Sequence, residues 1–533
     1  MDRPRTKQVC TIGPASAEKI AELVLAGMDV ARVNFSHGTP EDHKAYIHGV
    51  RSAAHSARRS VATLVDLPGP KLRLGDFDGG EARLTTGSTF TLRAAPSEAK
   101  PEPKPEPKPE VAAEVEAQVA EGPPEAPEEE PAAEPEAAPE PAPVADAETE
   151  EEADTTAHLQ APAQPTADAS GAVVRSGDLS SQLQVGDRVL LADGAVELKV
   201  SAVEPGVVTT EVINGGLIRS RSGVNIPSAR FIGNGLTDAD RAGVTQALEL
   251  RADLIAQSFV RSAADVQALR ALLPTDGPRL VAKIETDAAV NDFDAICAAA
   301  DGIMVARGDL GVDVPFETVP LIQKDLIERA RAQGKFAIVA TQMLESMTDA
   351  PRPTRAEASD VANAVLDGAD GVMLSAETAI GAYPVEALQA MERICLAAER
   401  APSAARTAND PATSIVYAAA MTSDYTQVGA VWCFTRTGRT ADLLSQYRPR
   451  VPIIAFTLSP VVARRLAVRG GVIPLVLPAA GKNAPLVEQM EAAWRSQKPA
   501  GDYDTVLLVT TSAQPTGINR LEIHHLSGAS AKR

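Results

Sequence analysis

Short apolar runs that end in polar or small residues alternate with stretches of helical apolar spacing along most of the chain. Eight such runs precede residue 380: QVCTIGPAS, DVARVNFSHG, SVATLVDLPG, ADLIAQSFV, RLVAKIE, DGIMVARGD, FAIVATQM and DGVMLSAET. Segments between them, such as SAEKIAELVLAG and SAADVQALRALL, have the pattern of amphipathic helices. Eight strand–helix units predict an α/β protein built on a closed parallel (β/α)8 barrel, with functional side chains at the carboxyl ends of the strands.

Two regions depart from this rhythm. Strand-like pieces with glycine-rich turns, such as STFTLR and GVVTTEVINGG, follow the third run and predict a small inserted β-barrel domain. Beyond residue 401, the runs VGAVWCFT, VPIIAFT, GVIPLVL and DTVLLVTT alternate with helical stretches and predict a C-terminal α/β domain. We therefore expect a barrel of residues 1–70 and 237–400, an inserted β domain of residues 71–236, and a C-terminal domain of residues 401–533.

Composition changes abruptly at residues 96–170, which are rich in Pro, Glu and Ala. Such a segment cannot bury enough apolar surface to offset its ordering entropy, so we expect a disordered acidic insert; a partner-binding segment is the alternative. The whole chain has a net charge of -20. This segment alone holds 21 acidic residues and three lysines. The remainder, with 50 acidic and 48 basic residues, is nearly neutral, which indicates no nucleic-acid-binding surface.

The cysteine pattern and the hydropathy narrow the class of protein further. Four cysteines lie far apart and form no CxxC or Cys/His cluster, so neither a disulfide framework nor a structural zinc site is expected. The N-terminus has no apolar signal core, and no run of about 18 apolar residues occurs. We expect a cytoplasmic protein without a membrane partner.

Charged and hydroxyl side chains gather at the predicted strand ends. In chain order they are Arg32, Asn34, Ser36, Asp66, Arg73, Lys283, Glu285, Arg307, Asp309, Thr341, Ser375 and Glu377. Glu285 and Asp309 could share Mg²⁺ or Mn²⁺, because such an ion accepts carboxylate oxygens and keeps positions for water and substrate. Alternatively, these acids only pair with Lys283 and Arg307.

Several longer motifs together point to one family. CTIGPAS, GMDVARVNFSHG, VAKIE, MVARGDLGVD, ATQMLESM and PRPTRAEASDVANAVLDGADGVMLSAET resemble pyruvate kinase, over nearly the whole chain except residues 96–170. The resemblance implies a catalytic barrel, an inserted lid domain, a C-terminal regulatory domain and a homotetramer. It implies transfer of the phosphoryl group of phosphoenolpyruvate to ADP, giving pyruvate and ATP.

The resemblance also implies roles for the residues at the strand ends. Lys283 and Arg73 would hold the transferred phosphoryl group, and Arg32 would bind and act on the substrate beside them. Glu285 and Asp309 would hold the divalent ion, Mg²⁺ or Mn²⁺, in the substrate site.

Further roles concern the substrate carboxylate, the proton and the nucleotide. Backbone groups near Gly308 and Thr341 would receive the substrate carboxylate, and a water relay near Thr341 and Ser375 would protonate the enolate. The residues that fall where the family binds the nucleotide are Pro14, Asn34 and His37; a capping role is the alternative for His37.

Two departures from the family pattern concern the strength of catalysis. LTDADRAG has Ala239 where the family usually has a lysine that helps to bind the nucleotide phosphates, and Thr286 and Ala289 replace the usual Asn and Gly. A catalytically weakened, metabolite-binding pseudoenzyme of the same fold is therefore the alternative. The retained Lys283 and Glu285 favour the enzyme.

The stretch DLPGPKLRLG, residues 66–75, resembles the potassium-independent branch of the family. Lys71 stands where potassium-requiring members have a glutamate. The region that holds the monovalent ion in those members matches Asn34, Ser36, Asp66 and Leu67. A tethered ammonium can supply the charge of a bound ion, so we expect Lys71 to replace K⁺. A solvated lysine at the lid hinge is the alternative.

A second phosphate-binding candidate lies in the C-terminal domain. FTRTGRTA, residues 434–441, follows a predicted strand and opens a helix, so its hydroxyl and amide groups could hold the phosphate of an allosteric effector. The candidate ligands are Thr435, Thr437, Gly438 and Thr440. A simple helix cap is the alternative, and TSAQPTGIN near residue 515 lacks the family's glycine-rich loop, which leaves the effector unidentified.

Overall fold

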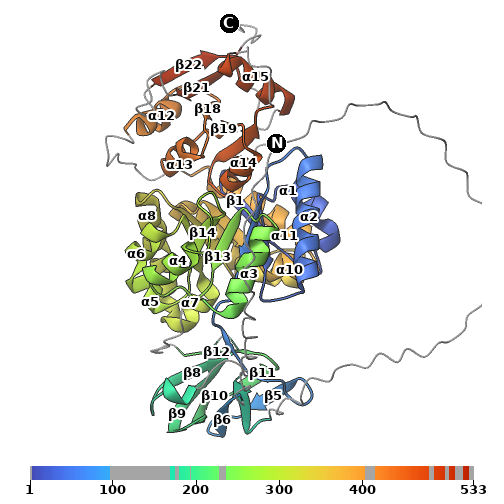
Figure 1. Ribbon diagram of the computed structural model, residues 1–533, viewed down its shortest axis with the longest axis vertical. Helices are drawn as coiled ribbons and strands as arrows, with labels where there is room; N and C mark the ends of the chain where they lie inside the picture. The colour runs from blue at the N-terminus through green and yellow to red at the C-terminus, as the bar shows by residue number, and fades with distance from the viewer. Residues whose placement is uncertain are drawn as a thin grey trace, which may run out of the picture. The chain divides into compact units, whose positions relative to one another are not determined.

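The structure, a computed structural model, describes residues 3–95, 168–174, 179–192, 194–226, 236–401, 414–478, 485–497, 503–510 and 520–526. The insert expected at residues 96–170 lies outside this described set except for residues 168–170, and so does TSAQPTGIN at residues 511–519. A barrel, an inserted β domain and a C-terminal α/β domain are the folded parts that the structure describes (Figure 1).

Eight parallel strands close into a barrel in chain order, with the inserted domain between the third and the fourth. They are β1 (Lys7–Ile12), β2 (Val30–Asn34), β3 (Ala62–Asp66), β13 (Leu254–Gln257), β14 (Arg279–Ile284), β15 (Gly302–Ala306), β16 (Phe336–Ala340) and β17 (Gly371–Leu374). All eight runs singled out in the sequence form these strands, so the predicted barrel is confirmed. Side chains such as Leu64, Met304 and Phe336 fill its interior. Residue 302 must be glycine there, because a Cβ would lie 2.3 Å from the Phe336 ring.

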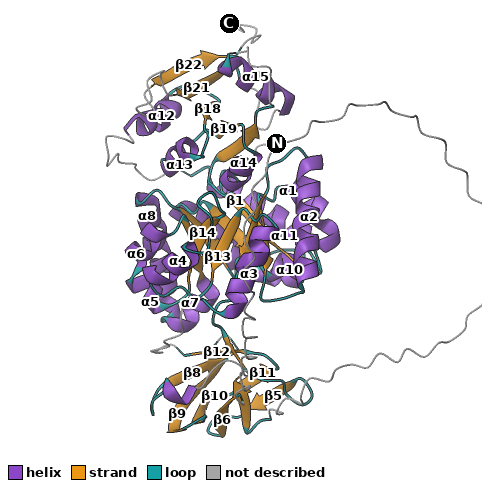
Figure 2. Ribbon diagram, in the orientation of Figure 1, coloured by secondary structure: helices purple, strands orange, loops and turns teal. Residues whose placement is uncertain are grey.

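Helices cover the outside of the barrel (Figure 2). They are α1 (Ile20–Ala26), α2 (Pro40–Ser56), α3 (Asp238–Glu249), α4 (Ala263–Arg270), α5 (Asp287–Asn291), α6 (Phe293–Ala299), α7 (Arg307–Asp313), α8 (Val319–Ala332), α9 (Arg355–Asp367), α10 (Ala376–Ala379) and α11 (Pro384–Ala398). Capping boxes at Thr39, Thr237 and Thr354 start α2, α3 and α9. These caps fix where each helix begins and therefore the length of the loop that precedes it.

The inserted domain combines a seven-stranded sheet, in the order β4-β12-β8-β9-β10-β6-β7, with a two-stranded sheet, β11-β5. Its strands are β4 (Leu72–Arg73), β5 (Glu81–Leu84), β6 (Thr89–Ala94), β7 (Gly171–Val174), β8 (Arg188–Leu191), β9 (Val196–Glu204), β10 (Val207–Asn214), β11 (Gly216–Arg219) and β12 (Gly223–Asn225). Alternate residues such as Phe90, Val189 and Val212 are buried in its core. The predicted small, barrel-like β domain is confirmed.

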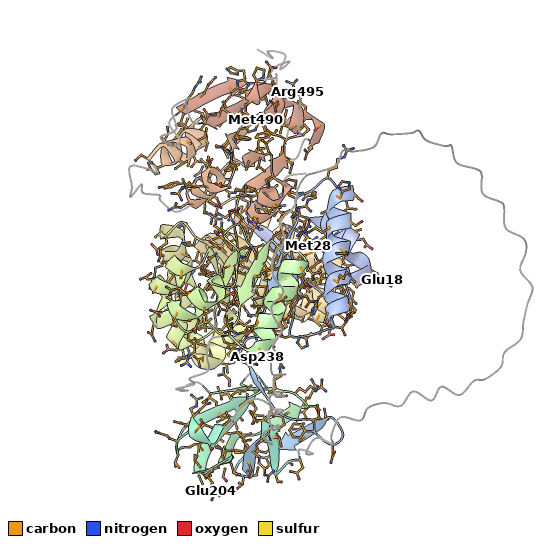
Figure 3. All side chains as sticks on the ribbon, in the orientation of Figure 1. Glu18, Met28, Glu204, Asp238, Met490 and Arg495 are labelled. Carbon is orange, nitrogen blue, oxygen red and sulfur yellow. The ribbon has the colours of Figure 1, made fainter. Side chains whose placement is uncertain are left out.

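The C-terminal domain has a five-stranded sheet in the order β20-β19-β18-β21-β22. Its elements are α12 (Ser414–Tyr425), β18 (Ala430–Phe434), α13 (Arg439–Gln446), β19 (Ile453–Thr457), α14 (Pro460–Leu466), β20 (Val472–Val476), α15 (Leu486–Gln497), β21 (Thr505–Thr510) and β22 (Arg520–His525). The four predicted strands form the parallel part, and β22 adds an antiparallel edge. In α15, Met490 is buried while Arg495 lies on the surface (Figure 3).

No helix among the described residues is long and apolar enough to cross a membrane.

Candidate active site

The predicted site residues of the second and third strands meet because β2 and β3 pair in register, with Asn34 opposite Asp66. Arg32 lies two residues before Asn34 on β2. Its Nε and Nη2 lie 2.8 and 2.7 Å from Asp66 Oδ2. Its Nη1 donates to Thr11 Oγ1 at 3.0 Å. The guanidinium is thus fixed between two strands, with its charge directed at a fully buried carboxylate.

Lys283, near the end of β14, is the central cation of the site. Its buried Nζ lies 2.8 Å from Glu285 Oε1 and 3.3 Å from Asp66 Oδ1, and donates to Ser258 Oγ at 2.7 Å. Burial alone lowers the pKa of Lys283, but the two carboxylates outweigh it and raise the pKa to about 12. Lys283 therefore stays charged at neutral pH in a site with little water.

Glu285 is the buried acid that follows the same strand. Its Oε2 accepts the backbone N–H of Phe259 at 2.7 Å, and Phe259 adopts a left-handed φ of 54°. Burial raises the pKa of Glu285 and the nearby Asp309 adds to this effect, although Lys283 opposes both. Its Oε1 receives no well-directed hydrogen bond from any residue of the described ranges. The carboxylate is therefore held in place by Phe259 on one oxygen and by the Lys283 ammonium, 2.8 Å away, on the other.

Glu285 and Asp309 fit the predicted divalent ion in chemical type. Both present carboxylate oxygens, the donors that Mg²⁺ and Mn²⁺ prefer. In the part of the chain that the structure describes, no group of three or more His, Cys, Asp or Glu residues converges. A small hard cation held by this pair would keep its other positions for water and substrate.

Lys71 and Arg73 leave the barrel toward the inserted domain through a constrained turn. Gly69 adopts φ +68°, where a Cβ would lie 2.9 Å from that of Ser258, and its N–H donates to Asp240 Oδ1 at 2.9 Å. This turn brings Lys71 Nζ to 2.8 Å from Asp309 Oδ1. The ammonium thus neutralises one of the two predicted metal ligands, while Arg32 and Lys283 meet the charge of Asp66, the predicted monovalent-ion ligand.

The remaining residues of the predicted monovalent-ion region lie together at the ends of β2 and β3. Ser36 N–H donates to Asn34 Oδ1 at 3.1 Å, and Phe35 N–H donates to the Asp66 carbonyl at 3.0 Å. Leu67 is buried and its N–H donates to the Ala256 carbonyl. The predicted residues are therefore brought together by the local backbone.

Arg307, at the end of β15, does not pair with Asp309 as the alternative reading expected. It pairs with Asp360 at 2.6 Å and donates to the carbonyl of Thr341 at 2.8 Å. Thr341 has φ 68°, and its hydroxyl accepts the Gly308 N–H at 2.7 Å. Backbone strain of this kind is concentrated at functional sites in proteins.

Ser375 has a buried hydroxyl without a hydrogen-bond partner among the described residues. Its backbone N–H donates to Glu377 Oε2 at 2.7 Å, and Glu377 Oε1 accepts the N–H of Leu344 at 3.0 Å. Burial raises the pKa of Glu377. An unpartnered buried hydroxyl is a natural position for a bound water or substrate atom.

Two cavities lie where the barrel meets the inserted domain. One, of about 400 Å³, is lined by residues including Pro70, Phe259, Thr286 and Asp309. The other, of about 480 Å³, is lined by His37, Lys71, Arg73, Ala192, Leu217, Arg219, Ser220, Arg221, Ser222 and Gly223. Lys71 lines both. The first has both acidic and basic lining residues, whereas the second has basic ones and no acid among its described lining residues, and we call it the basic cavity.

Of the predicted nucleotide residues Pro14, Asn34 and His37, only His37 is among the described residues that line the second cavity. His37 lines it, and partial burial followed by the charges of Arg73, Arg32 and Lys71 lowers its pKa. The His37 carbonyl lies 2.7 Å from His43 Nε2. Pro14 is exposed beyond β1.

The predicted effector loop forms the start of α13 in the C-terminal domain. Thr435 is buried and its Oγ1 accepts the N–H of Gly438 at 2.9 Å, so this hydroxyl closes the turn. Gly438 has φ 98° and is the N-cap of α13, whereas Thr437 is exposed and Thr440 half-buried. The loop combines the geometry of a helix cap with exposed polar groups.

Sequence reasoning missed several residues that the structure places in the site. Ser258 and Phe259 follow a predicted strand, so the rule used for the other strand ends could have found them. Asp360 lies within α9 and Arg219 and Arg221 lie in the inserted domain, where no strand-end signal applies. Only the fold brings these three residues to the site.

Comparisons with known proteins identify the family. Residues 3–104 and 145–388 match the family model of the pyruvate kinase barrel domain, and residues 413–524 match that of its alpha/beta domain. The chain is 37% identical to a pyruvate kinase of Geobacillus stearothermophilus, over 99% of this chain and 81% of the relative. It is 36% identical to that of Mycobacterium intracellulare and 35% identical to that of Corynebacterium efficiens, each over 98% of both chains. The chain therefore belongs to the pyruvate kinase family.

Proposed function

We propose that this chain transfers the phosphoryl group of phosphoenolpyruvate to ADP, the last step of glycolysis, with a divalent ion and without K⁺. The observation that carries the proposal is the buried Lys283, which Asp66 and Glu285 keep charged. Phosphoryl transfer needs charge neutralisation and positioning more than covalent help from the protein. In this proposal residues 1–70 and 237–400 form the catalytic barrel, 71–236 the lid and 401–533 the regulatory domain.

Three basic side chains neutralise and position the transferred phosphoryl group and the substrate in this proposal: Lys283, Arg73 and Arg32. Lys283 is fixed by three contacts, so its charge requires little rearrangement during the reaction. Arg32 is fixed by Asp66 and Thr11. Arg73 lines the basic cavity, where it can follow a phosphoryl group from one substrate to the other.

Glu285 and Asp309 hold Mg²⁺ or Mn²⁺ in this proposal. When bound, the ion supplies positive charge to the oxygens of the phosphoryl group and of the enolpyruvate. The burial of Glu285 and its raised pKa support this assignment, because a cation beside a buried carboxylate stabilises the charged form of that carboxylate. Lys71 contacts Asp309 at Oδ1, so the carboxylate could accept the ion through Oδ2 while Lys71 stays in place.

Lys71 takes the place of the monovalent ion. Its ammonium already lies in the site, tethered by the turn at Gly69 and placed 2.8 Å from Asp309. The side chain is 24% exposed, which argues against a lysine that is merely solvated at the hinge. A fixed positive charge at this position supports phosphoryl transfer without requiring K⁺ to bind.

In this proposal the substrate carboxylate and the enolate contact residues that follow the strands β15, β16 and β17. Gly308 and Thr341 lie together, and a substrate carboxylate can replace the Thr341 hydroxyl as acceptor of the Gly308 N–H. The unpartnered hydroxyl of Ser375 supports a water relay that delivers a proton to carbon. Asn34, His37 and Pro14 form the nucleotide side.

Allosteric control is a second part of the proposal. Asp442 of α13 accepts two hydrogen bonds from Arg279, at 3.0 and 2.8 Å, and lies 3.2 Å from the buried Arg469. Arg279 begins β14, the strand that carries Lys283. A phosphorylated effector bound by Thr435, Thr437, Gly438 and Thr440 would therefore act one helical turn from a direct link to the catalytic strand.

The proposal includes a homotetramer in the cytoplasm. The described cysteines, all four of the chain, are buried and form no disulfide, in keeping with a reducing compartment. The predicted assembly is measured directly by light scattering of the purified protein.

The reaction is tested by ³¹P NMR of phosphoenolpyruvate and ADP with Mg²⁺ and the purified chain. We expect the phosphoenolpyruvate signal to be replaced by the γ-phosphate of ATP. Release of inorganic phosphate without ATP, or no reaction at all, would favour the pseudoenzyme alternative.

A further inference from the structure

The basic cavity of about 480 Å³ carries more positive charge than the assigned residues supply. Besides His37, Lys71 and Arg73, it is lined by Arg219 and Arg221, two arginines that have no assigned role. None of the described lining residues is acidic. A cavity of this size with one lysine and three arginines is suited to a polyanion rather than to a single carboxylate.

The two arginines stand on a fixed turn between β11 and β12. Arg221 has a left-handed φ of 64°, and its carbonyl accepts a hydrogen bond from Arg73 Nη1 at 3.2 Å. Ser222 N–H donates to the Arg219 carbonyl at 3.0 Å, and Ser220 Oγ accepts the Phe77 N–H at 2.8 Å. The turn is therefore tied to the chain segment that enters the lid, next to Arg73.

The guanidinium groups have acidic partners but keep donors for a ligand. Arg221 Nε lies 2.9 Å from Asp76 Oδ1, and Arg219 Nε lies 3.9 Å from Glu81 Oε2. The side chains of Arg221 and Arg219 are 65% and 75% exposed, so these pairs are weak. An arginine has five N–H donors. A carboxylate that pairs with Nε leaves the other N–H donors of the guanidinium for a ligand.

Position 239, at the start of α3, carries no charge in this chain. Residue 239 is an exposed alanine at the start of α3, next to Asp238 (Figure 3) and to Asp240, which holds the turn at Gly69. The lysine expected at this position from the family pattern would have pointed a cation at the nucleotide phosphates. The chain has instead two arginines on the lid.

We infer that Arg219 and Arg221 bind the phosphates of the nucleoside diphosphate from the lid and thereby supply the charge that position 239 lacks. This inference rests on the proposed function, because it concerns the second substrate of that reaction. It adds specificity-determining residues that the sequence motifs do not indicate. In the proposed function phosphoenolpyruvate is held at Lys283 and Asp309, neither of which lines the basic cavity, so it is not the ligand of the two arginines.

The test is the double variant Arg219→Gln/Arg221→Asn. Asn is chosen at position 221 because it tolerates a positive φ, so the change removes the charge with little strain. We expect the KM for ADP to rise about tenfold, the effect of losing a charge-assisted hydrogen bond, with kcat and the KM for phosphoenolpyruvate nearly unchanged. Arg188→Gln is the matched control, because Arg188 is another exposed lid arginine, 2.7 Å from Glu197, and lines neither cavity.

Two further variants separate charge from structure. Arg219→Lys/Arg221→Lys should keep most of the affinity for ADP, and Ala239→Lys added to the neutral double variant should restore part of it. An unchanged KM for ADP in the neutral double variant would overturn the inference. So would equal losses for both substrates, which would mean that the arginines only shape the lid. Inactivity of the unaltered chain would instead refute the proposed function, so the two failures are distinguishable.

Discussion

Replacing Lys283 by methionine removes the cation on which the site depends. Lys283 Nζ lies within 3.3 Å of two buried carboxylates, those of Asp66 and Glu285. Losing a positioned charge in a site with little water should lower kcat about a thousandfold, or about 4 kcal/mol at the transition state. The same change leaves buried negative charge unpaired, which costs about 3 to 5 kcal/mol of folding free energy.

The stability loss should depend on pH in a definite direction. Burial already raises the pKa of Glu285 above its ordinary value, and Lys283 is the group that opposes this shift. Without Lys283 the folded-state pKa rises further, so the variant is destabilised at pH values above that pKa and recovers as the pH falls and Glu285 takes up a proton. The difference in Tm between Lys283→Met and the unaltered protein should therefore narrow from pH 8 toward pH 5.

Steady-state kinetics and thermal unfolding across this pH range provide the assay. Lys199→Met is the control, because Lys199 is an exposed lysine of the lid strand β9. Near-native turnover in folded Lys283→Met would remove this lysine from the mechanism. A Tm difference that is constant with pH would refute the electrostatic account of the Lys283 site.

Three other predictions test separate parts of the account. Lys71→Glu should make activity depend on added KCl, because the tethered ammonium is lost; activity that remains independent of KCl would refute the role of Lys71. Replacing residues 98–164 by a short Gly/Ser linker should leave kcat and Tm nearly unchanged, because this sequence lacks core-forming residues. Because β6 and β7 are parallel, the linker must be long enough to run back from the end of β6 to the start of β7. Asp442→Asn should reduce the response of the kinetics to sugar phosphates and nucleotides, because it weakens the link to Arg279; an undiminished response would show that the effector acts by another route.

The fold could be predicted from sequence because its signals are local. Eight apolar runs with helical stretches between them define the barrel, and each strand forms where it was expected. The strand β22 was missed because RLEIHH is short and mostly polar, and at the sheet edge each of its residues is exposed or half-buried. Such an edge strand has little to distinguish it from a loop.

The site was predictable where residues follow strands and unpredictable where their partners come from elsewhere. Lys283, Glu285 and Asp66 were found by position, and they converge. The partner of Lys71 was not found, because the contact with Asp309 joins residues 238 positions apart. The alternative that Arg307 pairs with Asp309 does not hold, because Asp360 of α9 pairs with Arg307 instead.

The central claim is a pyruvate kinase reaction that needs a divalent ion but no K⁺. The most direct measurement is the initial rate of pyruvate formation from phosphoenolpyruvate and ADP with Mg²⁺, in a tetramethylammonium buffer with and without KCl. The account predicts a rapid reaction whose rate is the same in both buffers. No pyruvate in either buffer, or a rate that rises about tenfold or more with KCl, a step of about 1.4 kcal/mol in the barrier, would contradict it.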